Sequence, residues 1–213
     1  MLNKKQVIFC CMCLLIVHSE QQKINVAVYF ESLCPDSQKF IIDQLYPNWD
    51  DIRDYINIKF IPFGKSISLD NGTKFACQHG SQECKGNRIM SCALREIPNQ
   101  DLQVEYLRCF MDVYKFAKIN DSENGQKCAQ LLGLDYNRLM YNCYQTKEGT
   151  NLQLQAEIET NAIQPQFVPT IVYNGVFDQK LQDSSILNFR DTVCSLIRQI
   201  YPEGCSYRTV VQI

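Results

Sequence analysis

The chain has no excess of positive charge, no internal repeat, and no long apolar run beyond its N-terminal segment. Its 213 residues include 21 Lys and Arg against 23 Asp and Glu, a formal net charge of −2. A chain with this balance lacks the basic surface that attracts nucleic acids or anionic membranes, so we expect neither as a partner. What it does have is a hydrophobic content of 46%, enough for an ordinary packed core, and an unusual number of cysteines.

The one apolar run, near the N-terminus, indicates a cleaved leader. Lys4 and Lys5 precede apolar residues at 7–17, and His18 and Ser19 follow. This order is typical of a secretory signal peptide, whereas a membrane anchor needs about 20 apolar residues. We predict that residues 1–19 are removed and that residues 20–213 form one domain in the secretory pathway.

The number of cysteines gives the first chemical constraint. Of the 12 cysteines, Cys10, Cys11 and Cys13 lie in the leader, which leaves nine. Nine is odd, and in an oxidising compartment a leftover cysteine indicates a free reactive thiol or an intermolecular disulfide. If Cys34 is the free one, the others can pair as disulfides, and their spacing leaves the pairing open. These others are Cys77, Cys84, Cys92, Cys109, Cys128, Cys143, Cys194 and Cys205.

Cys34 lies where a strand pattern gives way to a helix pattern. Residues 24–30 alternate between apolar and other side chains, as a strand does. Apolar residues within 40–45 follow at helical spacing, and Pro35 suits the first turn of a helix. At a helix N-terminus, unpaired amides and the helix dipole stabilise a thiolate. Cys-x-x-Cys at such a junction is typical of a thioredoxin-like redox site, and Ser37 in the second position makes this a monothiol variant.

The order of the remaining elements predicts an α/β, thioredoxin-like fold with a helical insertion. Residues 55–63 are a second β-rich run, which completes a βαβ unit with the first strand and helix. Strand patterns then fade, and helical spacing dominates in the segment that follows. A strand at 165–175 comes next, with an Asn174-Gly175 hairpin turn, a short second strand, and a closing helix with one apolar face at 186–200. We expect the insertion at about 75–160, stapled by disulfides.

Val168-Pro169-Thr170 is the second chemical landmark. A proline that opens a strand is tolerated only at an edge or a special bend. In thioredoxin-like folds the corresponding proline is cis and faces the active cysteine, beside backbone groups with which a substrate peptide can pair. The alternative is an ordinary trans proline, because cis bonds are a minority of X–Pro bonds. We predict that Pro169 is cis and belongs to the catalytic site.

A dense motif at Cys77–Cys92 identifies a family. The segment matches Cys-Gln-His-Gly-x2-Glu-Cys-x2-Asn-x4-Cys at every fixed position. It resembles the signature of the gamma-interferon-inducible lysosomal thiol reductase family, and the order of elements agrees along the mature chain. The resemblance implies a thioredoxin-like fold with a helical insertion and reduction of disulfides in protein substrates, often at acidic pH in endosomes or lysosomes. We therefore expect the mature chain to be secreted and/or lysosomal. The resemblance also implies that Cys34 is the nucleophile and that Ser37 occupies the resolving position, where members usually carry cysteine.

The same motif contains residue types that bind metals in other proteins: Cys77, His79, Cys84 and Cys92. Structural zinc sites prefer closely paired cysteines, and secretion favours disulfides, so we predict no metal site. We interpret His79 as a hydrogen-bonded structural residue rather than a proton donor. We interpret the other polar motif residues as holding a turn-rich loop together: Gln78, Gly80, Glu83 and Asn87.

The serine at position 37 determines the expected chemistry. Ser37 can donate a hydrogen bond to a Cys34 thiolate, but it cannot attack sulfur. We therefore expect Cys34 to form a mixed disulfide with a substrate and an outside thiol, such as glutathione or free cysteine, to resolve it without any other cofactor. Two alternatives stay open: a secreted binding protein with weak or no reductase activity, and a covalent dimer linked through Cys34 in place of a monomer.

Two segments match the acceptor sequence for N-glycosylation, Asn71-Gly72-Thr73 and Asn120-Asp121-Ser122. In a secreted chain both are candidate sites on surface loops. We rank Asn71 above Asn120 because threonine is the better acceptor.

Overall fold

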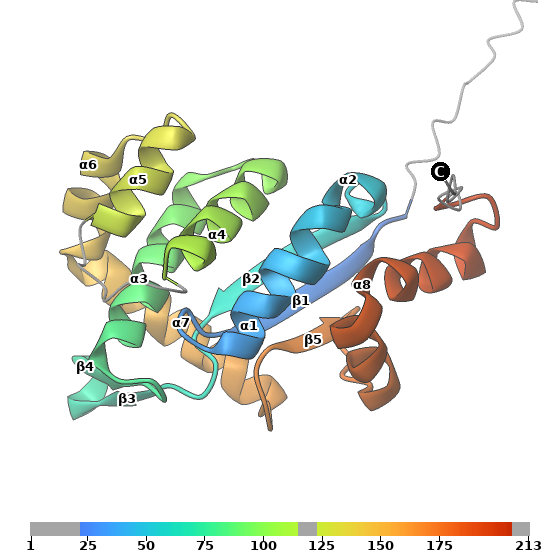
Figure 1. The fold of residues 1–213 in the computed structure, drawn as a ribbon. Helices are drawn as coiled ribbons and strands as arrows, with labels where there is room; N and C mark the ends of the chain where they lie inside the picture. Colours follow the sequence, from blue (N-terminus) through green and yellow to red (C-terminus); the bar gives the residue numbers. More distant parts are fainter. Residues whose placement is uncertain (1–21, 115–122, 206–213) are drawn as a thin grey trace, which may run out of the picture.

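A three-stranded sheet with the order β2-β1-β5 forms the centre of the computed structural model, which describes residues 22–114 and 123–205 (Figure 1). β1 (Ile24–Phe30) pairs in parallel with β2 (Ile56–Pro62) and antiparallel with β5 (Thr170–Tyr173). A separate antiparallel pair joins β3 (Ile67–Leu69) to β4 (Lys74–Ala76). The strands predicted at 24–30 and 55–63 are therefore confirmed as β1 and β2, and β1 is the central strand.

Helices make up most of the rest of the chain. The first helical run begins as α1 (Pro35–Lys39), continues through a π-helical turn at Phe40–Leu45 and a 3-10 turn at Tyr46–Asn48, and ends as α2 (Trp49–Ile52). The others are α3 (Ser81–Glu96), α4 (Gln100–Tyr114), α5 (Glu123–Leu131), α6 (Tyr136–Leu139) with a π-helical turn at Met140–Tyr144, α7 (Lys147–Ile163) and α8 (Gln179–Ile200).

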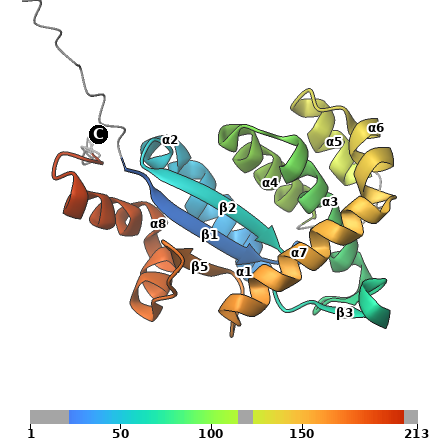
Figure 2. The same ribbon diagram turned by 180° about the vertical axis from the view of Figure 1, so that it is seen from behind.

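Helices lie on both faces of the sheet (Figures 1 and 2). The last three residues of β1 and of β2, and all of β5, are buried. On one face Phe40, at the start of the π-helical turn, meets Phe189 of α8 edge-to-face at 5.2 Å between ring centroids. On the other face Ala156 of α7 packs against Tyr29 and Val172 of the sheet. Burial on both sides explains why apolar residues exceed strict alternation in β1.

Disulfides tie the helices between β4 and β5 to one another. Cys92 of α3 is bonded to Cys143 in the turn after α6, and Cys109 of α4 is bonded to Cys128 of α5. α3 and α7 also pack beside β2 (Figure 2). The two bridges therefore link α3 to the turn after α6, and α4 to α5, while α3 also packs against α4.

The predicted hairpin after β5 is only partly correct. Asn174 and Gly175 do form the turn, with φ of 49° and 78°. The predicted second strand is wrong, because it is reduced to a single bridge between Tyr173 and Val176. The physical reason is that α8 starts too soon: Asp178 caps it by accepting a hydrogen bond from the Leu181 N–H at 2.9 Å.

The apolar face predicted for the closing helix also needs correction. Helical geometry breaks at Asn188, where φ is −154° and ψ is 83°. Phe189 and Val193 lie in the core beyond this break, whereas Ile186 before it is 38% exposed. The break rotates the two halves of α8 relative to each other, so one continuous apolar stripe does not form.

Several expectations fall outside the described residues, among them the leader at 1–19 and Asn120. The structure does describe Asn71, which is exposed in the turn that joins β3 to β4 and has a φ of 55°. Within residues 22–114 and 123–205, no helix has both the length and the apolar character needed to cross a membrane.

Candidate active site

Cys34 and Pro169 meet at the junction of β1 and α1. Cys34 is the N-cap residue of α1, with extended backbone (φ −65°, ψ 120°), and Pro35 is the first helical residue. The Cys34 Sγ donates to the backbone carbonyl oxygen of Val168 at 3.6 Å, and the residue is only 6% exposed. The Val168–Pro169 peptide bond is cis. Cys34 and Pro169, which are far apart in the sequence, thus lie side by side in the fold.

Ser37 lies one helical turn after Cys34 and is completely buried. Its hydroxyl oxygen accepts a hydrogen bond from the backbone N–H of Glu31 at 3.3 Å. Sequence reasoning considered only a bond from Ser37 to the Cys34 thiolate and missed this contact with the strand end. The hydroxyl therefore joins the residue that follows β1 to α1.

Among the cysteines that the structure describes, Cys34 is the free one. The others form four disulfides: Cys77–Cys84, Cys92–Cys143, Cys109–Cys128 and Cys194–Cys205. The motif cysteines thus belong to two different bridges, because Cys77 pairs with Cys84 while Cys92 pairs with Cys143. A zinc cluster made from these cysteines is incompatible with that pairing.

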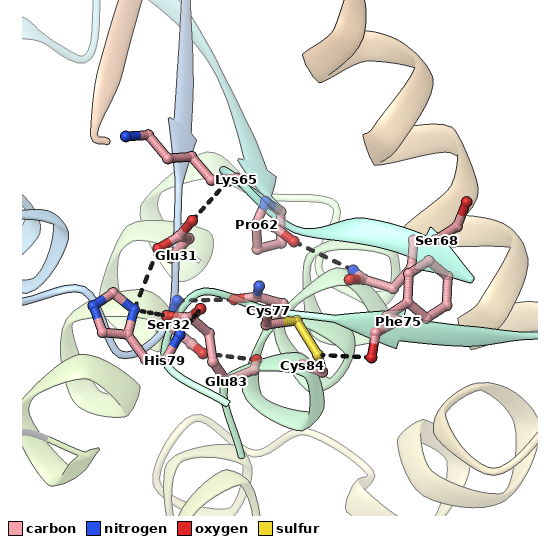
Figure 3. Close-up of a disulfide and its surroundings, with 12 residues drawn as sticks. Glu31, Ser32, Pro62, Lys65, Ser68, Phe75, Cys77, His79, Glu83 and Cys84 are labelled. Atoms are coloured by element: carbon pink, nitrogen blue, oxygen red, sulfur yellow. Dashed lines mark hydrogen bonds and ion pairs between the residues drawn. A yellow bond between two sulfur atoms is a disulfide. The ribbon is translucent and has the colours of Figure 1, made fainter. Parts of the chain in front are cut away.

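The motif helix α3 supports the loop that leads to Cys34. The Ser32 N–H donates to Asn87 Oδ1 at 2.8 Å, and the Ser32 hydroxyl donates to the backbone carbonyl of Glu83 at 3.0 Å (Figure 3). Gly86 allows this close approach, since a Cβ there would lie 2.8 Å from the Ser32 Cβ. Glu83 and Asn87 of the family motif therefore hold the residue two positions before Cys34.

A cluster of two buried carboxylates and the more exposed His79 lies beside this loop (Figure 3). His79 Nδ1 is 2.6 Å from Glu83 Oε2 and 3.4 Å from Glu31 Oε2. The backbone N–H of His79 donates to Glu83 Oε1 at 3.0 Å, and the backbone N–H of Lys65 donates to Glu31 Oε1 at 2.6 Å. Both carboxylates are completely buried. His79 is therefore hydrogen-bonded, as expected, and its partner is the motif residue Glu83.

Glu31 is the electrostatically unusual member of this cluster. Burial raises the pKa of its carboxyl from an ordinary 4.5 to about 7, with the Lys65 N–H bond partly offsetting the rise. Gly64 makes room for this side chain: its φ is +60°, and a Cβ there would lie 2.5 Å from Glu31 Oε1. Sequence reasoning did not connect Glu31 to His79, because no local pattern relates a strand end to a distant loop.

Glu31, His79 and Glu83 are a group, found among the residues that the structure describes, that could hold a metal ion, with one ligand atom each and all within 4.8 Å of one another. Ligands on a tetrahedral ion with bonds of about 2.1 Å are roughly 3.4 Å apart. The 2.6 Å separation of His79 Nδ1 and Glu83 Oε2 is instead a hydrogen-bond distance. As placed, the groups bind one another.

The chain is similar to proteins of one known family. The profile of the family described as gamma interferon inducible lysosomal thiol reductase (GILT) matches residues 25–132. GILT-like protein 1 of Drosophila melanogaster is 34% identical over 207 residues, covering 91% of this chain and 83% of the relative. Gamma-interferon-inducible lysosomal thiol reductase of Carassius auratus is 32% identical, covering 85% of this chain and 72% of the relative.

Solved structures agree on the fold. DsbA of Chlamydia trachomatis superposes with a TM-score of 0.55 at 13% identity, over 84% of this chain and 87% of that chain. The oxidoreductase NmDsbA1 of N. meningitidis superposes with a TM-score of 0.53 at 14% identity, over 90% of both chains. The predicted α/β, thioredoxin-like fold with a helical, disulfide-stapled insertion is confirmed. The chain therefore belongs to the gamma-interferon-inducible lysosomal thiol reductase family of thiol-disulfide oxidoreductases.

Proposed function

We propose that this chain reduces or exchanges disulfides of protein substrates through a monothiol cycle at Cys34. The observation that carries the proposal is the placement of the free Cys34 at a helix N-cap, with its sulfur 3.6 Å from the carbonyl that precedes cis-Pro169. A thiolate at a helix N-terminus is stabilised by unpaired amides. The carbonyl of Val168 marks where the backbone of a substrate can approach the sulfur.

The first step is attack by the Cys34 thiolate on one sulfur of a substrate disulfide. A bond forms between Cys34 and that sulfur, the substrate S–S bond breaks, and the other substrate sulfur leaves as a thiolate that takes up a proton. The product is a mixed disulfide between Cys34 and the substrate.

The second step needs a small thiol from outside, such as glutathione or free cysteine. Its thiolate attacks the Cys34 sulfur and releases the second substrate thiol. A second small thiol then frees Cys34 and leaves as the small-molecule disulfide, so two small thiols supply the two electrons. Ser37 occupies the resolving position but cannot carry out this attack, because a hydroxyl does not exchange with a disulfide.

The alternative function is a secreted binding protein of the same fold with weak or no reductase activity. Ser37 is the feature that favours it. The Ser37 hydroxyl already accepts a hydrogen bond from the Glu31 N–H at 3.3 Å, a contact that serves the fold without any redox chemistry. Under this alternative, Cys34 would react once with a disulfide and would not turn over with any small thiol.

The test is a disulfide-reduction assay at pH 4.5–5 and at pH 7 on the mature chain, with and without glutathione. We expect wild type to reduce a disulfide-bonded protein only when glutathione is present. Cys34→Ser should lose all activity and should form no mixed disulfide with the substrate, whereas Ser37→Cys should gain turnover without glutathione. Circular dichroism would check that both variants are folded.

Two results would contradict the monothiol cycle. Full activity in Cys34→Ser would show that the chemistry occurs elsewhere. A trapped Cys34 adduct without turnover at any glutathione concentration would favour the binding protein. Non-reducing electrophoresis of the same samples separates a monomer from a Cys34-linked dimer.

We also propose a route through the secretory pathway for the mature chain. Relatives named lysosomal thiol reductases are consistent with a secretory or lysosomal location. We propose residues 1–19 as the cleaved leader, residues 20–213 as one domain with its insertion at about 75–160, and Asn71 and Asn120 as glycosylation sites. N-terminal sequencing and glycosidase treatment of protein made in a secreting cell test these points.

A further inference from the structure

A groove of about 450 Å³ lies beside the active cysteine. Its lining includes Val168 and cis-Pro169, the segment whose carbonyl contacts the Cys34 sulfur. Asp36 on α1 also lines the groove, as do three residues of α8: Asp183, Ile186 and Leu187. A substrate chain joined to Cys34 would therefore have this groove next to it.

The α8 wall of the groove is fixed relative to the proline. Gln182, which is 2% exposed, donates to the Pro169 carbonyl at 3.0 Å and accepts from the Ile171 N–H at 2.7 Å. These two bonds pin the first half of α8 to the start of β5. The groove is thus built by buried hydrogen bonds rather than by two unconnected surface elements.

The rim on α8 is apolar and uncovered. Asp183, Ile186 and Leu187 follow at i, i+3 and i+4, which places them on the same face of the helix. Leu187 is 78% exposed and Ile186 is 38% exposed. The helical geometry of α8 is interrupted immediately afterwards, at Asn188. Ile186 and Leu187 therefore present aliphatic surface to whatever occupies the groove.

The groove is also acidic. Among its lining residues, the charged ones are Asp36 in the first turn of α1 and Asp183 on α8. Asp183 Oδ1 accepts a hydrogen bond from Gln179 Nε2 at 2.7 Å, which holds that carboxylate in place. Two carboxylates without a lining Lys or Arg favour a cationic occupant by charge complementarity.

We propose that this groove binds the substrate segment that flanks the attacked disulfide, and that it selects segments with an aliphatic side chain and a Lys or Arg beside the cysteine. The proposal rests on the proposed function and adds the substrate class. The aliphatic side chain packs on Ile186 and Leu187, and the cationic group lies between Asp36 and Asp183.

The test uses the mature chain and a matched set of peptides, each with its cysteine linked by a disulfide to a chromophoric aromatic thiol. Attack by Cys34 on the peptide sulfur releases that thiol. The peptides differ only beside the cysteine, with Lys, Gln or Glu at one neighbour and Leu or Ser at the other. A small aromatic disulfide without a peptide reports the reactivity of Cys34 alone.

We expect the Lys peptide to react about fivefold faster than the Glu peptide at low salt, and the ratio to shrink as salt screens the charges. Asp36→Asn combined with Asp183→Asn should bring the ratio close to one. Asp43→Asn, on the same helical run but outside the groove, is the matched control and should leave the ratio unchanged. Leu187→Ser should slow the Leu peptides more than the Ser peptides.

Equal rates for the Lys and Glu peptides would overturn the proposal, and so would a ratio that survives in the double variant. In both cases the small disulfide still reacts at Cys34, so the proposed function stands. If the small disulfide fails to react at Cys34, the proposed function itself is contradicted, and the groove proposal falls with it.

Discussion

The Glu31 carboxyl should make the folded chain more stable at acidic pH than at neutral pH. Burial raises its pKa from 4.5 to about 7. As pH rises, the unfolded chain loses this proton first, while the folded chain keeps it until about pH 7. The stabilising contribution is therefore complete below pH 4.5, is lost progressively up to pH 7, and does not change above that. The loss amounts to about 3 kcal/mol of unfolding free energy.

Glu31→Gln isolates this effect. Glutamine keeps an oxygen that can accept from the Lys65 N–H, now 2.6 Å from Glu31 Oε1. Its amide can donate toward Glu83 and does not titrate. We expect the variant to match the unfolding free energy of wild type near pH 4.5 and to exceed it by about 3 kcal/mol near pH 8, because only wild type then carries a buried charge at position 31.

Urea unfolding between pH 4.5 and pH 8, with the disulfides intact, measures the difference. Trp49 is the one tryptophan of the chain and is buried, so its fluorescence reports unfolding. Glu157→Gln is the matched control, since Glu157 also accepts a backbone N–H, from Ser68 at 2.8 Å, but is only partly buried. A constant difference between Glu31→Gln and wild type across this range would refute the reasoning.

Three further substitutions test the supports of the site. Gly86→Ala should cost about 1–3 kcal/mol by overpacking against Ser32 and slow alkylation of Cys34, with urea midpoints and alkylation rates as the measurements. Gly64→Ala should cost a similar amount through its positive φ and its clash with Glu31, and combining it with a smaller residue at position 31 should recover part of the loss. Removing the Cys92–Cys143 bridge, whose ends are 51 residues apart, should cost about 4 kcal/mol and leave a folded Cys34 site at low temperature, as melting curves would show.

Local patterns predicted the junction around Cys34 because strand and helix periodicity depend on neighbouring residues. The alternation at 24–30 and Pro35 placed the cysteine at a helix start, where the structure has it. The same approach failed after β5, because a turn signal does not say whether a second strand follows. There the capping bond from Leu181 to Asp178 started a helix instead.

The amino-acid sequence by itself determined the fold class and the family, and it singled out Cys34 as the candidate nucleophile, because these depend on short-range order and on a dense motif. Only the tertiary structure decided which cysteines pair, what the motif residues hold, and which surface flanks Cys34. Glu83 and Asn87 contact Ser32 across about 50 residues of chain, and Gln182 contacts Pro169 and Ile171 beside the groove. Such contacts arise from packing helices on a sheet, which no local periodicity encodes.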